Sequence, residues 1–275
     1  MAKSLGYFQQ EGVKVTVADM AGSSKVMEAL LGGSADIGAG SLEQSIQMAA
    51  EGHPIQTFLT EFFNFGFSLV ASPKASRPIT KLEDLRGATV GVTSPGSQSH
   101  LLVSFLLNRH GLRAQDYSTV SVGLGASNFS ALEQGRIDAA ITTPNVLLLL
   151  QSKYPHAAVL FDPLPRDSFE EVFGVPRYPS HVLYARLNWI EQNKPAVHRV
   201  AKAVVRALQY IAVNSPEVVA SKIPAGYRTG NGASDVAALK RWKMLYSSDG
   251  VTPPSSFSAV RAVTALSVEK VRSTY

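Results

Sequence analysis

A serine-rich turn in residues 93–99 is the segment of this sequence best suited to bind a ligand. It reads Thr-Ser-Pro-Gly-Ser-Gln-Ser and lies between a predicted strand and a predicted helix. At such a turn, free backbone N–H groups and the positive end of the helix dipole face outward, which favours an anion. We therefore take Ser94, Gly96, Ser97 and Gln98 as candidate ligand-binding residues. Helix capping by Ser97 or Ser99 explains the pattern equally well, since the turn carries neither a GxxxxGK(S/T) phosphate loop nor a GxGxxG motif.

Three further turns have the same character, with small and hydroxyl-bearing residues between a predicted strand and a predicted helix. Their candidate binding residues are Gly40 and Ser41 in the first, Ser127 in the second, and Thr143 and Asn145 in the third. In an open α/β sheet, ligands bind outside the carboxyl ends of the strands, where these turns would lie. The four turns together predict a binding cleft.

Catalytic and metal-binding patterns are missing from the sequence. The six histidines form no HExxH spacing, and there is no GxSxG elbow for a serine hydrolase. The chain has no cysteine, which excludes disulfides, thiolate metal sites, Fe–S clusters and cysteine nucleophiles. His100 alone stands beside a candidate turn, and a histidine on a helix surface is the favoured interpretation. We predict no catalytic residue, no metal site and no cofactor.

Alternating strand and helix patterns must position these turns. Strands are predicted at 13–18, 35–40, 55–61, 67–71, 89–93, 119–123, 137–142 and 158–161, with helices near 23–32, 42–51, 98–110, 128–134 and 145–152. This alternation is typical of βαβ units and predicts a doubly wound α/β fold. After Tyr184 the pattern becomes helical: a long amphipathic helix around 197–211 is followed by helices near 216–222, 234–247 and 255–272.

An internal repeat predicts that the fold contains two similar α/β lobes. Residues 29–37 match residues 131–139 at Ala, Leu, Gly and Asp. Each copy reads as a helix end, a turn and a buried strand, so Gly33 and Gly135 are expected in the left-handed conformation. For Asp36 and Asp138, hydrogen bonds to turn amides are favoured over a catalytic role.

The charge distribution argues against nucleic-acid binding. The formal net charge is +5. Residues 1–185 hold 13 basic and 16 acidic side chains, and residues 186–275 hold 13 and 5. The basic excess therefore belongs to the helical third, where neither aromatic interleaving nor a binding motif accompanies it. The longest aliphatic run, 146–150, is far shorter than the ~20 residues of a membrane span.

Three segments resemble the solute-binding proteins of ABC importers. They are LGYFQQEGVKV at 5–15, the Ala-Leu…Gly…Ala-Asp-Ile-Gly pattern at 29–38, and LEDLRGATVGV at 82–92. The branch most similar is that of the aliphatic sulfonate, taurine and nitrate binders, grouped with the binders of thiamine pyrimidine precursors. The similarity extends from Leu5 to about Asn214.

The resemblance implies two α/β lobes of the type 2 periplasmic binding protein fold, with a small solute held between them. Lobe 1 would comprise residues 1–72 and 181–275, with the C-terminal helices as its extension, and lobe 2 residues 73–180. The implied partners are a small-molecule solute and a membrane-embedded permease, and the protein would be a monomer, periplasmic or anchored outside the membrane. Family members carry a signal peptide and a first strand ahead of the Gly-Tyr-Phe motif at 6–8, so the functional protein is expected to be longer at its N-terminus.

Two alternatives to a passive receptor remain. One is an enzyme of the same fold, similar to pyrimidine synthases, although those carry a Cys-rich motif that this chain lacks. The other is the sensing half of a transcription regulator, which would need an N-terminal helix-turn-helix. For the receptor, the expected solute is a small oxyanion, with a sulfonate preferred to nitrate and a neutral pyrimidine third.

Overall fold

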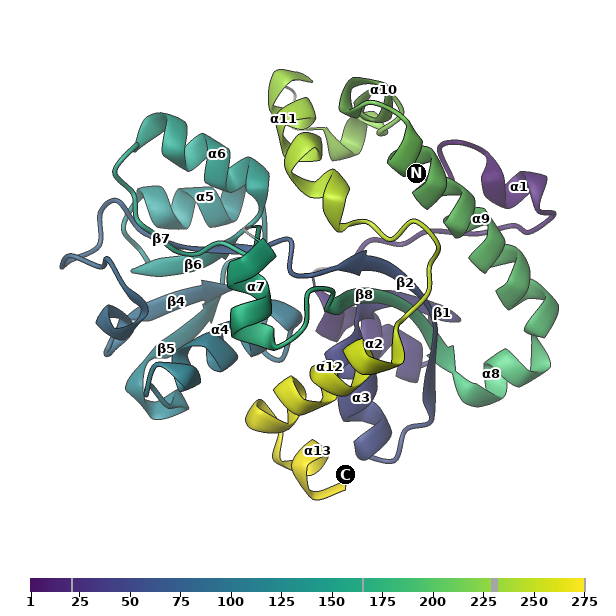
Figure 1. Ribbon diagram of the computed structural model, residues 1–275, viewed down its shortest axis with the longest axis horizontal. Coiled ribbons are helices and arrows are strands. Elements are labelled where there is room, and N and C mark those ends of the chain that lie inside the picture. Colours follow the sequence, from purple (N-terminus) through teal and green to yellow (C-terminus); the bar gives the residue numbers. More distant parts are fainter. Residues whose placement is uncertain (21, 165, 229–231, 275) are drawn as a thin grey trace.

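The strands form two separate sheets, seen on the two sides of the molecule in Figure 1. The computed structural model describes residues 1–20, 22–164, 166–228 and 232–274. One sheet has the order β1-β8-β2 and the other the order β5-β4-β6-β3-β7. The strands are β1 (Ile37–Ser41), β2 (Ile55–Phe63), β3 (Ser68–Ala71), β4 (Thr89–Val92), β5 (Ser118–Ser121), β6 (Ala139–Thr142), β7 (Val159–Phe161) and β8 (Pro179–Arg186). We call the first sheet with its helices lobe 1 and the second lobe 2.

Each sheet contains one strand that runs against its neighbours. In lobe 1, β8 lies between β1 and β2 and is antiparallel to both. In lobe 2, β3 lies between β6 and β7 in the same way. The units β1–α3–β2 and β6–α6–β7 are therefore equivalent, each with a strand inserted between its two parallel strands. This equivalence agrees with the internal repeat, whose two copies lead into β1 and β6.

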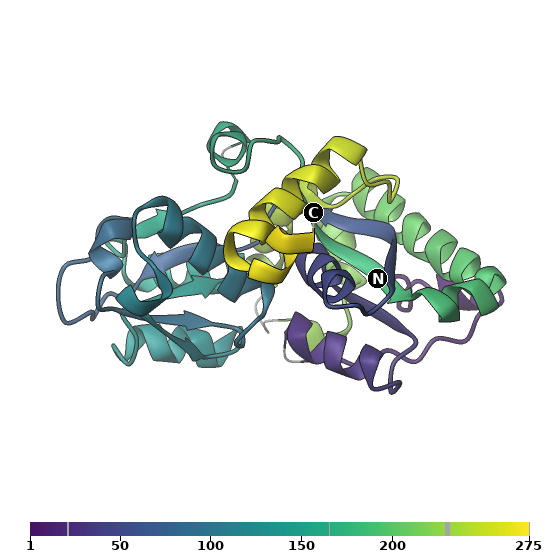
Figure 2. The same cartoon turned by 90° about the horizontal axis from the view of Figure 1, so that it is seen from below.

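Helices cover both sheets. Those before and between the strands are α1 (Tyr7–Gln10), α2 (Ser23–Leu31), α3 (Leu42–Ala50), α4 (Gln98–Arg109), α5 (Ala126–Glu133), α6 (Pro144–Lys153) and α7 (Arg166–Phe173). The C-terminal ones are α8 (Leu187–Gln192), α9 (Lys194–Val213), α10 (Pro216–Ser221), α11 (Gly232–Trp242), α12 (Pro254–Ser267) and α13 (Glu269–Thr274). We expected this extension on lobe 1 alone. Instead α12 packs on both α3 and α4, and α11 packs on α6, so the extension joins the lobes. Figure 2 shows α12 lying across the junction.

The chain crosses between the lobes twice, and the two crossings are hydrogen-bonded to each other. The Asn64 amide donates to the Tyr178 carbonyl at 2.6 Å, and the Tyr178 amide donates to Asn64 Oδ1 at 2.9 Å. Ser180 Oγ donates to the Asn64 carbonyl at 2.5 Å. Asn64 is the one non-glycine residue of the described chain with a positive φ, 59°, a conformation that asparagine tolerates better than most residues. The hinge is thus a paired segment.

The crossings lie a few residues earlier than the sequence suggested. We placed them near 67–73 and 180–185, but Ser68–Ala71 is already a strand of the lobe 2 sheet and Pro179–Arg186 is the central strand of lobe 1. The crossing segments are therefore residues 64–67 and about 174–178. The lobe limits that we expected at 72/73 and 180/181 therefore lie a few residues too far along the chain. That the lobes are separate folding units stays a prediction.

One expectation about the strands was wrong. The segment 13–18 alternates like a strand, yet the described residues there form none, and β1 is the edge of its sheet. An apolar alternation gives a strand only where a neighbour supplies hydrogen bonds. The sheets are mixed: among the described strands, β4 pairs in parallel with β5 and with β6, and the other pairs are antiparallel.

The turns of the repeat behave largely as expected. Gly33 and Gly135 have φ of 79° and 68°, and a side chain at Gly135 would strike the Lys74 carbonyl. The Asp138 carboxylate accepts from the Thr89 amide at 2.8 Å, which ties the start of β6 to the start of β4 rather than to a turn. Asp138 is therefore structural. Among the described helices, none is long and apolar enough to cross a membrane.

Candidate functional site

The turns of the two lobes meet at the carboxyl end of β1. Ser24 Oγ at the start of α2 and Ser94 Oγ share a hydrogen bond of 2.9 Å. Gln44 Nε2 on α3 donates to the Gly96 carbonyl at 2.9 Å. The Gln98 amide, the first of α4, donates to Ser23 Oγ at 3.3 Å. Two of the predicted turns, 40–41 and 94–98, are thus brought together from opposite lobes, with Ser23 and Ser24 as additional members.

Inside the 93–99 turn, three hydroxyl groups bond to one another. Thr93 Oγ1 donates to Ser97 Oγ at 2.7 Å, and Ser97 Oγ and Ser99 Oγ are 2.8 Å apart. Ser99 Oγ also accepts from the Thr93 amide at 2.9 Å. Ser97 stands at the N-cap position of α4, but its side chain does not accept from the helix amides. Both serines are buried, and their hydroxyl groups hold the turn in shape.

The backbone amides expected to bind an anion already have protein partners. The Ser94 amide donates to Ser97 Oγ at 3.4 Å, and the Ser97 amide donates to the Ser94 carbonyl at 3.2 Å. The Gly96 amide donates to His100 Nδ1 at 2.9 Å. The first amide of α4, that of Gln98, likewise donates to a protein group, the Ser23 hydroxyl of lobe 1.

Ser41 and Gly40 carry out structural tasks at the end of β1. Ser41 is buried, and its Oγ caps α3 by accepting from the Gln44 amide at 3.3 Å. Gly40 faces Tyr184 on β8: a Cβ at Gly40 would lie 2.5 Å from the Tyr184 hydroxyl and 3.4 Å from the Ser23 Cβ. The missing side chain leaves room for the tyrosine beside the facing turns.

Two buried polar atoms at this place have no hydrogen-bond partner in the described part of the chain. They are the Tyr184 hydroxyl and Gln44 Oε1, on side chains that are 0% and 6% exposed. Burial raises the pKa of Tyr184, so its hydroxyl stays protonated. A buried polar atom without a partner costs about 1–3 kcal/mol. Such atoms therefore mark a place where a bound molecule could supply the missing hydrogen bonds.

The remaining predicted residues are not joined to lobe 1 by any hydrogen bond that the structure describes. Ser127 is exposed, and its Oγ donates to the Val122 carbonyl at 2.7 Å within its own turn. Thr143 is the N-cap residue of α6, without a side-chain cap bond. Asn145 Oδ1 is buried and lacks a described partner. The structure thus brings the turns at 40–41 and 94–98 close together, and the ligand-binding role of all the predicted residues stays a prediction.

A buried carboxyl group lies next to the facing turns. Glu43, on the first turn of α3, is 2% exposed. Its Oε1 accepts from the Tyr178 hydroxyl at 3.0 Å, and its Oε2 accepts from Gln98 Nε2 at 3.3 Å. Gln98 Nε2 also donates to the Ser180 carbonyl at 2.7 Å. Burial raises the pKa of Glu43 to about 7, although the hydrogen bonds from Tyr178, Gln98 and Ser41 lower it.

His100 does not act as a positive group at this turn. Its Nδ1 accepts a hydrogen bond from the Gly96 amide and is therefore unprotonated. Partial burial lowers the pKa of His100, which favours the neutral ring. Within the described ranges, no cluster of His, Asp or Glu side chains is suited to hold a metal ion.

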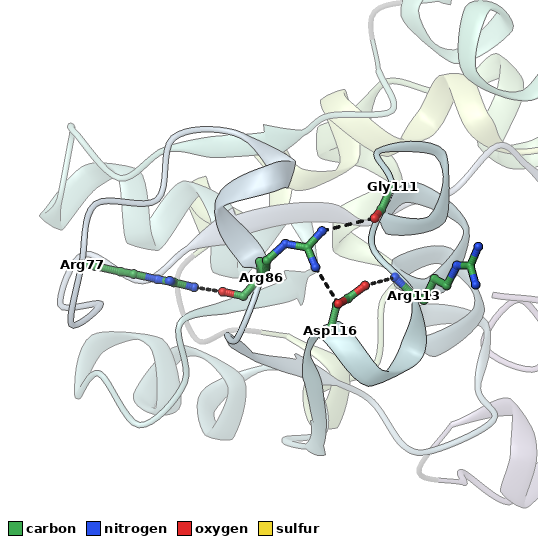
Figure 3. A network of polar contacts seen from close by, with 5 residues as sticks. All are labelled: Arg77, Arg86, Gly111, Arg113 and Asp116. Atoms are coloured by element: carbon green, nitrogen blue, oxygen red, sulfur yellow. Dashed lines mark hydrogen bonds and ion pairs between the residues drawn. The ribbon is translucent and has the colours of Figure 1, made fainter.

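Lobe 2 also contains a network of arginine contacts, drawn in Figure 3. Arg86 pairs with Asp116 at 2.5 Å and also donates to the Gly111 carbonyl at 3.3 Å. The second Asp116 oxygen accepts from the Arg113 amide at 2.7 Å, and Arg77 donates to the Arg86 carbonyl. These contacts join loops at the amino ends of β4 and β5, opposite the edge where ligands bind in such sheets. We regard the network as structural.

Two described cavities flank α3 and differ in volume and lining. One, of about 300 Å³, lies between α3, β2 and the segment at Thr252 and Phe257. The other, of about 10 Å³, is lined by Glu43 and by apolar side chains of α4 and α12. The smaller one has room for roughly one water molecule.

Sequence reasoning missed the residues that complete the site: Ser23, Ser24, Gln44, Glu43, Tyr178 and Tyr184. Ser23 and Ser24 follow a glycine at a helix start, the same signal that was used for the other turns. The pair Gly38 and Gly40, spaced by two in a strand, could have indicated a large side chain on the neighbouring strand. Nothing local in the sequence indicates that Glu43 is buried.

Two lobes, two adjacent crossings and helix-bearing turns that face each other between the lobes define the fold of the periplasmic binding proteins. A solved structure from Bordetella bronchiseptica RB50 is similar with a TM-score of 0.90 and 30% identity, covering 99% of this chain and 90% of that chain. The alkanesulfonate-binding protein SsuA from Xanthomonas axonopodis pv. citri, bound to MOPS, has a TM-score of 0.72 and 16% identity, over 98% and 88%. The family model described as NMT1/THI5 like matches residues 1–218. The chain belongs to this family.

A curated relative bears the name of an enzyme. The 4-amino-5-hydroxymethyl-2-methylpyrimidine phosphate synthase of Aspergillus parasiticus is 25% identical over 218 residues, 77% of this chain and 61% of that protein. Other synthases of the same name are matched over about 40% of their length. The chain thus spans less than two thirds of these relatives. The resemblance to solute-binding proteins that we drew from the sequence is confirmed for fold and family.

Proposed function

We propose that this protein is the solute-binding receptor of an ABC importer and that it holds a small oxyanion-bearing solute between its lobes. The observation that carries the proposal is the meeting of turns from both lobes at the carboxyl end of β1. There the Tyr184 hydroxyl and Gln44 Oε1 are buried without partners in the described chain. A receptor of this fold works by closing two lobes on a solute, and this is the place where the lobes touch.

The solute's oxyanion would replace the Ser23 hydroxyl at the start of α4. Ser23 Oγ accepts from the Gln98 amide, and Ser24 Oγ bonds to Ser94. A charged oxygen accepts more strongly from an amide at a helix N-terminus than a hydroxyl does. Separation of the lobes would free Gln98 N and Ser94 Oγ for the solute. Gln44 Oε1 and the Tyr184 hydroxyl would then bind a donor group on the same solute.

The alternative is a pyrimidine synthase or a binder of pyrimidine precursors. The names of the curated relatives favour it. Two observations speak for the receptor instead: the chain has no cysteine, and the site offers hydroxyl, amide and carboxyl groups without a nucleophile paired to a base. The receptor would work with a membrane-embedded permease and would act in the periplasm or anchored outside the membrane, as a monomer.

A thermal-shift screen tests the proposal. The ligands are methanesulfonate, taurine, nitrate and a neutral aminopyrimidine, in cationic buffers because sulfonate buffers are themselves candidates. A ligand at a hundredfold excess over its Kd stabilises the protein by about 2.7 kcal/mol. We expect sulfonates to raise the Tm most. If only the neutral pyrimidine raises it, the oxyanion proposal is wrong and the alternative gains.

A pair of variants tests whether the ligand-induced rise in Tm depends on the 94–98 turn. Ser94→Leu puts a bulky side chain where the lobes meet and should abolish the ligand shift with little effect on folding. Ser152→Leu makes the same change at an exposed position near the end of α6 and should leave the shift intact. An unchanged shift in Ser94→Leu would remove the 94–98 turn from the binding site.

A further inference from the structure

The junction beneath the site is built from both lobes, both crossings and the C-terminal extension. Phe65 on the first crossing contacts Tyr178 on the second at a ring-centroid distance of 5.0 Å. Phe173 stacks on Phe105 of α4 at 4.9 Å and contacts Phe65 at 5.1 Å. The Glu43 carboxyl lies on this aromatic cluster. It is thus placed where a rotation of one lobe against the other must change its surroundings.

The hydrogen bonds of Glu43 span the moving parts. Its own helix, α3, belongs to lobe 1, Gln98 begins α4 of lobe 2, and Tyr178 lies on the second crossing. Gln98 is also the residue whose backbone amide the proposed solute would bind. One residue of α4 therefore contacts the solute position with its amide and the carboxyl group with its side chain.

We propose that the Glu43 carboxyl is a proton-sensitive latch of the lobes: its neutral form favours the closed arrangement described here, and its ionised form favours lobes that have separated. The proposal rests on the proposed function for what separation serves, since the solute can reach the Gln98 amide only after the Ser23 hydroxyl has moved away. In the closed arrangement, the carboxyl faces a cavity with room for about one water. Separation of α3 from α4 would admit water, which stabilises the carboxylate.

No counter-charge is described that would keep the carboxylate ionised in the closed form. The causes that set its raised pKa are burial and the opposing hydrogen bonds of neutral donors. The charged side chains on the surrounding elements have other described partners: Lys25 with Glu28, Glu61 with His181, Arg186 with the Leu30 carbonyl, Arg109 with the Val172 carbonyl, Arg272 with the Ala265 carbonyl, and Arg177 with the Phe63 ring. Arg261 and Lys270 have partners too, and Glu269 on α13 is exposed. Tyr178 is the titratable group in contact with the carboxyl.

The sign of the pH dependence follows from the two arrangements. The carboxyl has a pKa of about 7 when closed, and about 4.5 when water reaches it, its ordinary value in the open form. The closed form therefore binds the proton more tightly. Linkage then makes the ratio of closed to open molecules about tenfold higher at pH 6 than at pH 8. Because the Ser23 hydroxyl holds the Gln98 amide in this arrangement, solute affinity should fall by a similar factor as the pH falls over this range.

The experiment measures the separation of the lobes without any added solute. Because the chain lacks cysteine, spin labels can be attached uniquely after Glu191→Cys on α8 and Gln115→Cys in lobe 2, both exposed positions. The distance distribution between the labels is recorded from pH 6 to pH 8. We expect the population at the distance of the closed arrangement to fall as the pH rises, with a midpoint near pH 7.

Three variants in this labelled background decide the result. Glu43→Gln should stay closed at every pH, because an amide cannot ionise. Glu51→Gln, at the exposed end of the same helix, is the matched control and should respond like the parent. Tyr178→Phe removes a hydrogen bond that lowers the pKa of Glu43, so its midpoint should move to higher pH.

A pH response that Glu43→Gln leaves intact, or its absence in the parent, overturns the latch. If circular dichroism shows that Glu43→Gln does not fold, the Tyr178→Phe variant is the test. A pH midpoint of Tyr178→Phe that equals that of the parent, or lies below it, then overturns the latch. The outcome is separate from that of the proposed function. If the distance responds to pH but methanesulfonate, taurine and nitrate do not bind, the latch stands and the receptor proposal fails. If one of them binds with an affinity independent of pH, and the distance between the labels is also constant, the receptor proposal stands and the latch fails.

Discussion

Replacing Gly40 by alanine should destabilise the protein through a single atom of Tyr184. The new Cβ would lie 2.5 Å from the Tyr184 hydroxyl, whereas the next ring atom, Cζ, is 3.3 Å away. Real Cβ contacts are not that short, and Tyr184 is fully buried on the central strand β8, so the ring has nowhere to move. Overpacking of this kind costs about 1–3 kcal/mol in unfolding free energy.

The same hydroxyl is unpaired in the described chain, so its removal should help folding. We expect Tyr184→Phe alone to be neutral or to stabilise by about 1 kcal/mol, because a buried donor without a partner is lost. In that background, the Cβ of Gly40→Ala meets no atom closer than the ring carbon at 3.3 Å. The double variant should therefore recover most of the cost, which predicts a coupling free energy of about 1–2 kcal/mol.

Urea denaturation of the four proteins in the cycle measures this coupling. Gly38→Ala is the matched control, since its Cβ would strike carbons of the same ring, with Cζ at 2.9 Å. Its cost should not change when tyrosine becomes phenylalanine. If Gly40→Ala costs as much with phenylalanine as with tyrosine, the clash is not with the hydroxyl and the reasoning fails. The thermal-shift screen on Tyr184→Phe tests the function of this hydroxyl. The affinity for the solute should drop, although the unfolding free energy without solute does not.

Two further predictions concern the hinge and the repeat. Asn64→Ala should cost about 1 kcal/mol more than Asn64→Gly, because both lose the acceptor for the Tyr178 amide but only alanine is strained at φ 59°; equal costs in urea denaturation would contradict a conformational role. Asp138→Ala leaves the Thr89 amide of β4 without its acceptor and should cost about 1–3 kcal/mol. The repeat counterpart Asp36→Ala should stay within about 0.5 kcal/mol, and a reversed order of these two costs would disprove the structural role of Asp138.

The sequence predicted those parts of the fold that local periodicity determines. The strands that became β1 to β7 and the helices between them follow from alternation, glycine turns and small-residue starts. The failures came from long-range pairing. The segment 13–18 alternates like the others but has no neighbour that would make it a strand, and β8 was interpreted as a crossing because its place between β1 and β2 depends on residues 140 positions away.

The same distinction between local and long-range features applies to the candidate site. The turns at 40–41 and 94–98 could be predicted, since strand ends and hydroxyl residues are visible in the chain. That they touch each other could be expected only from the two-lobe resemblance. The burial of Glu43 could not be predicted, because it depends on α4, α12 and both crossings closing around one helix turn. A glutamate two residues after a small cap residue normally faces water.

The position of the two crossings also bears on whether lobe 2 can be exchanged as a unit. The chain leaves lobe 1 at Asn64 and returns at Tyr178, and these two residues are hydrogen-bonded neighbours. Lobe 2 is therefore a cassette whose two ends meet, and such ends are where nature and protein engineers insert or remove whole units. A sensing surface of different chemistry could replace residues 65–177 without redirecting the strands on either side.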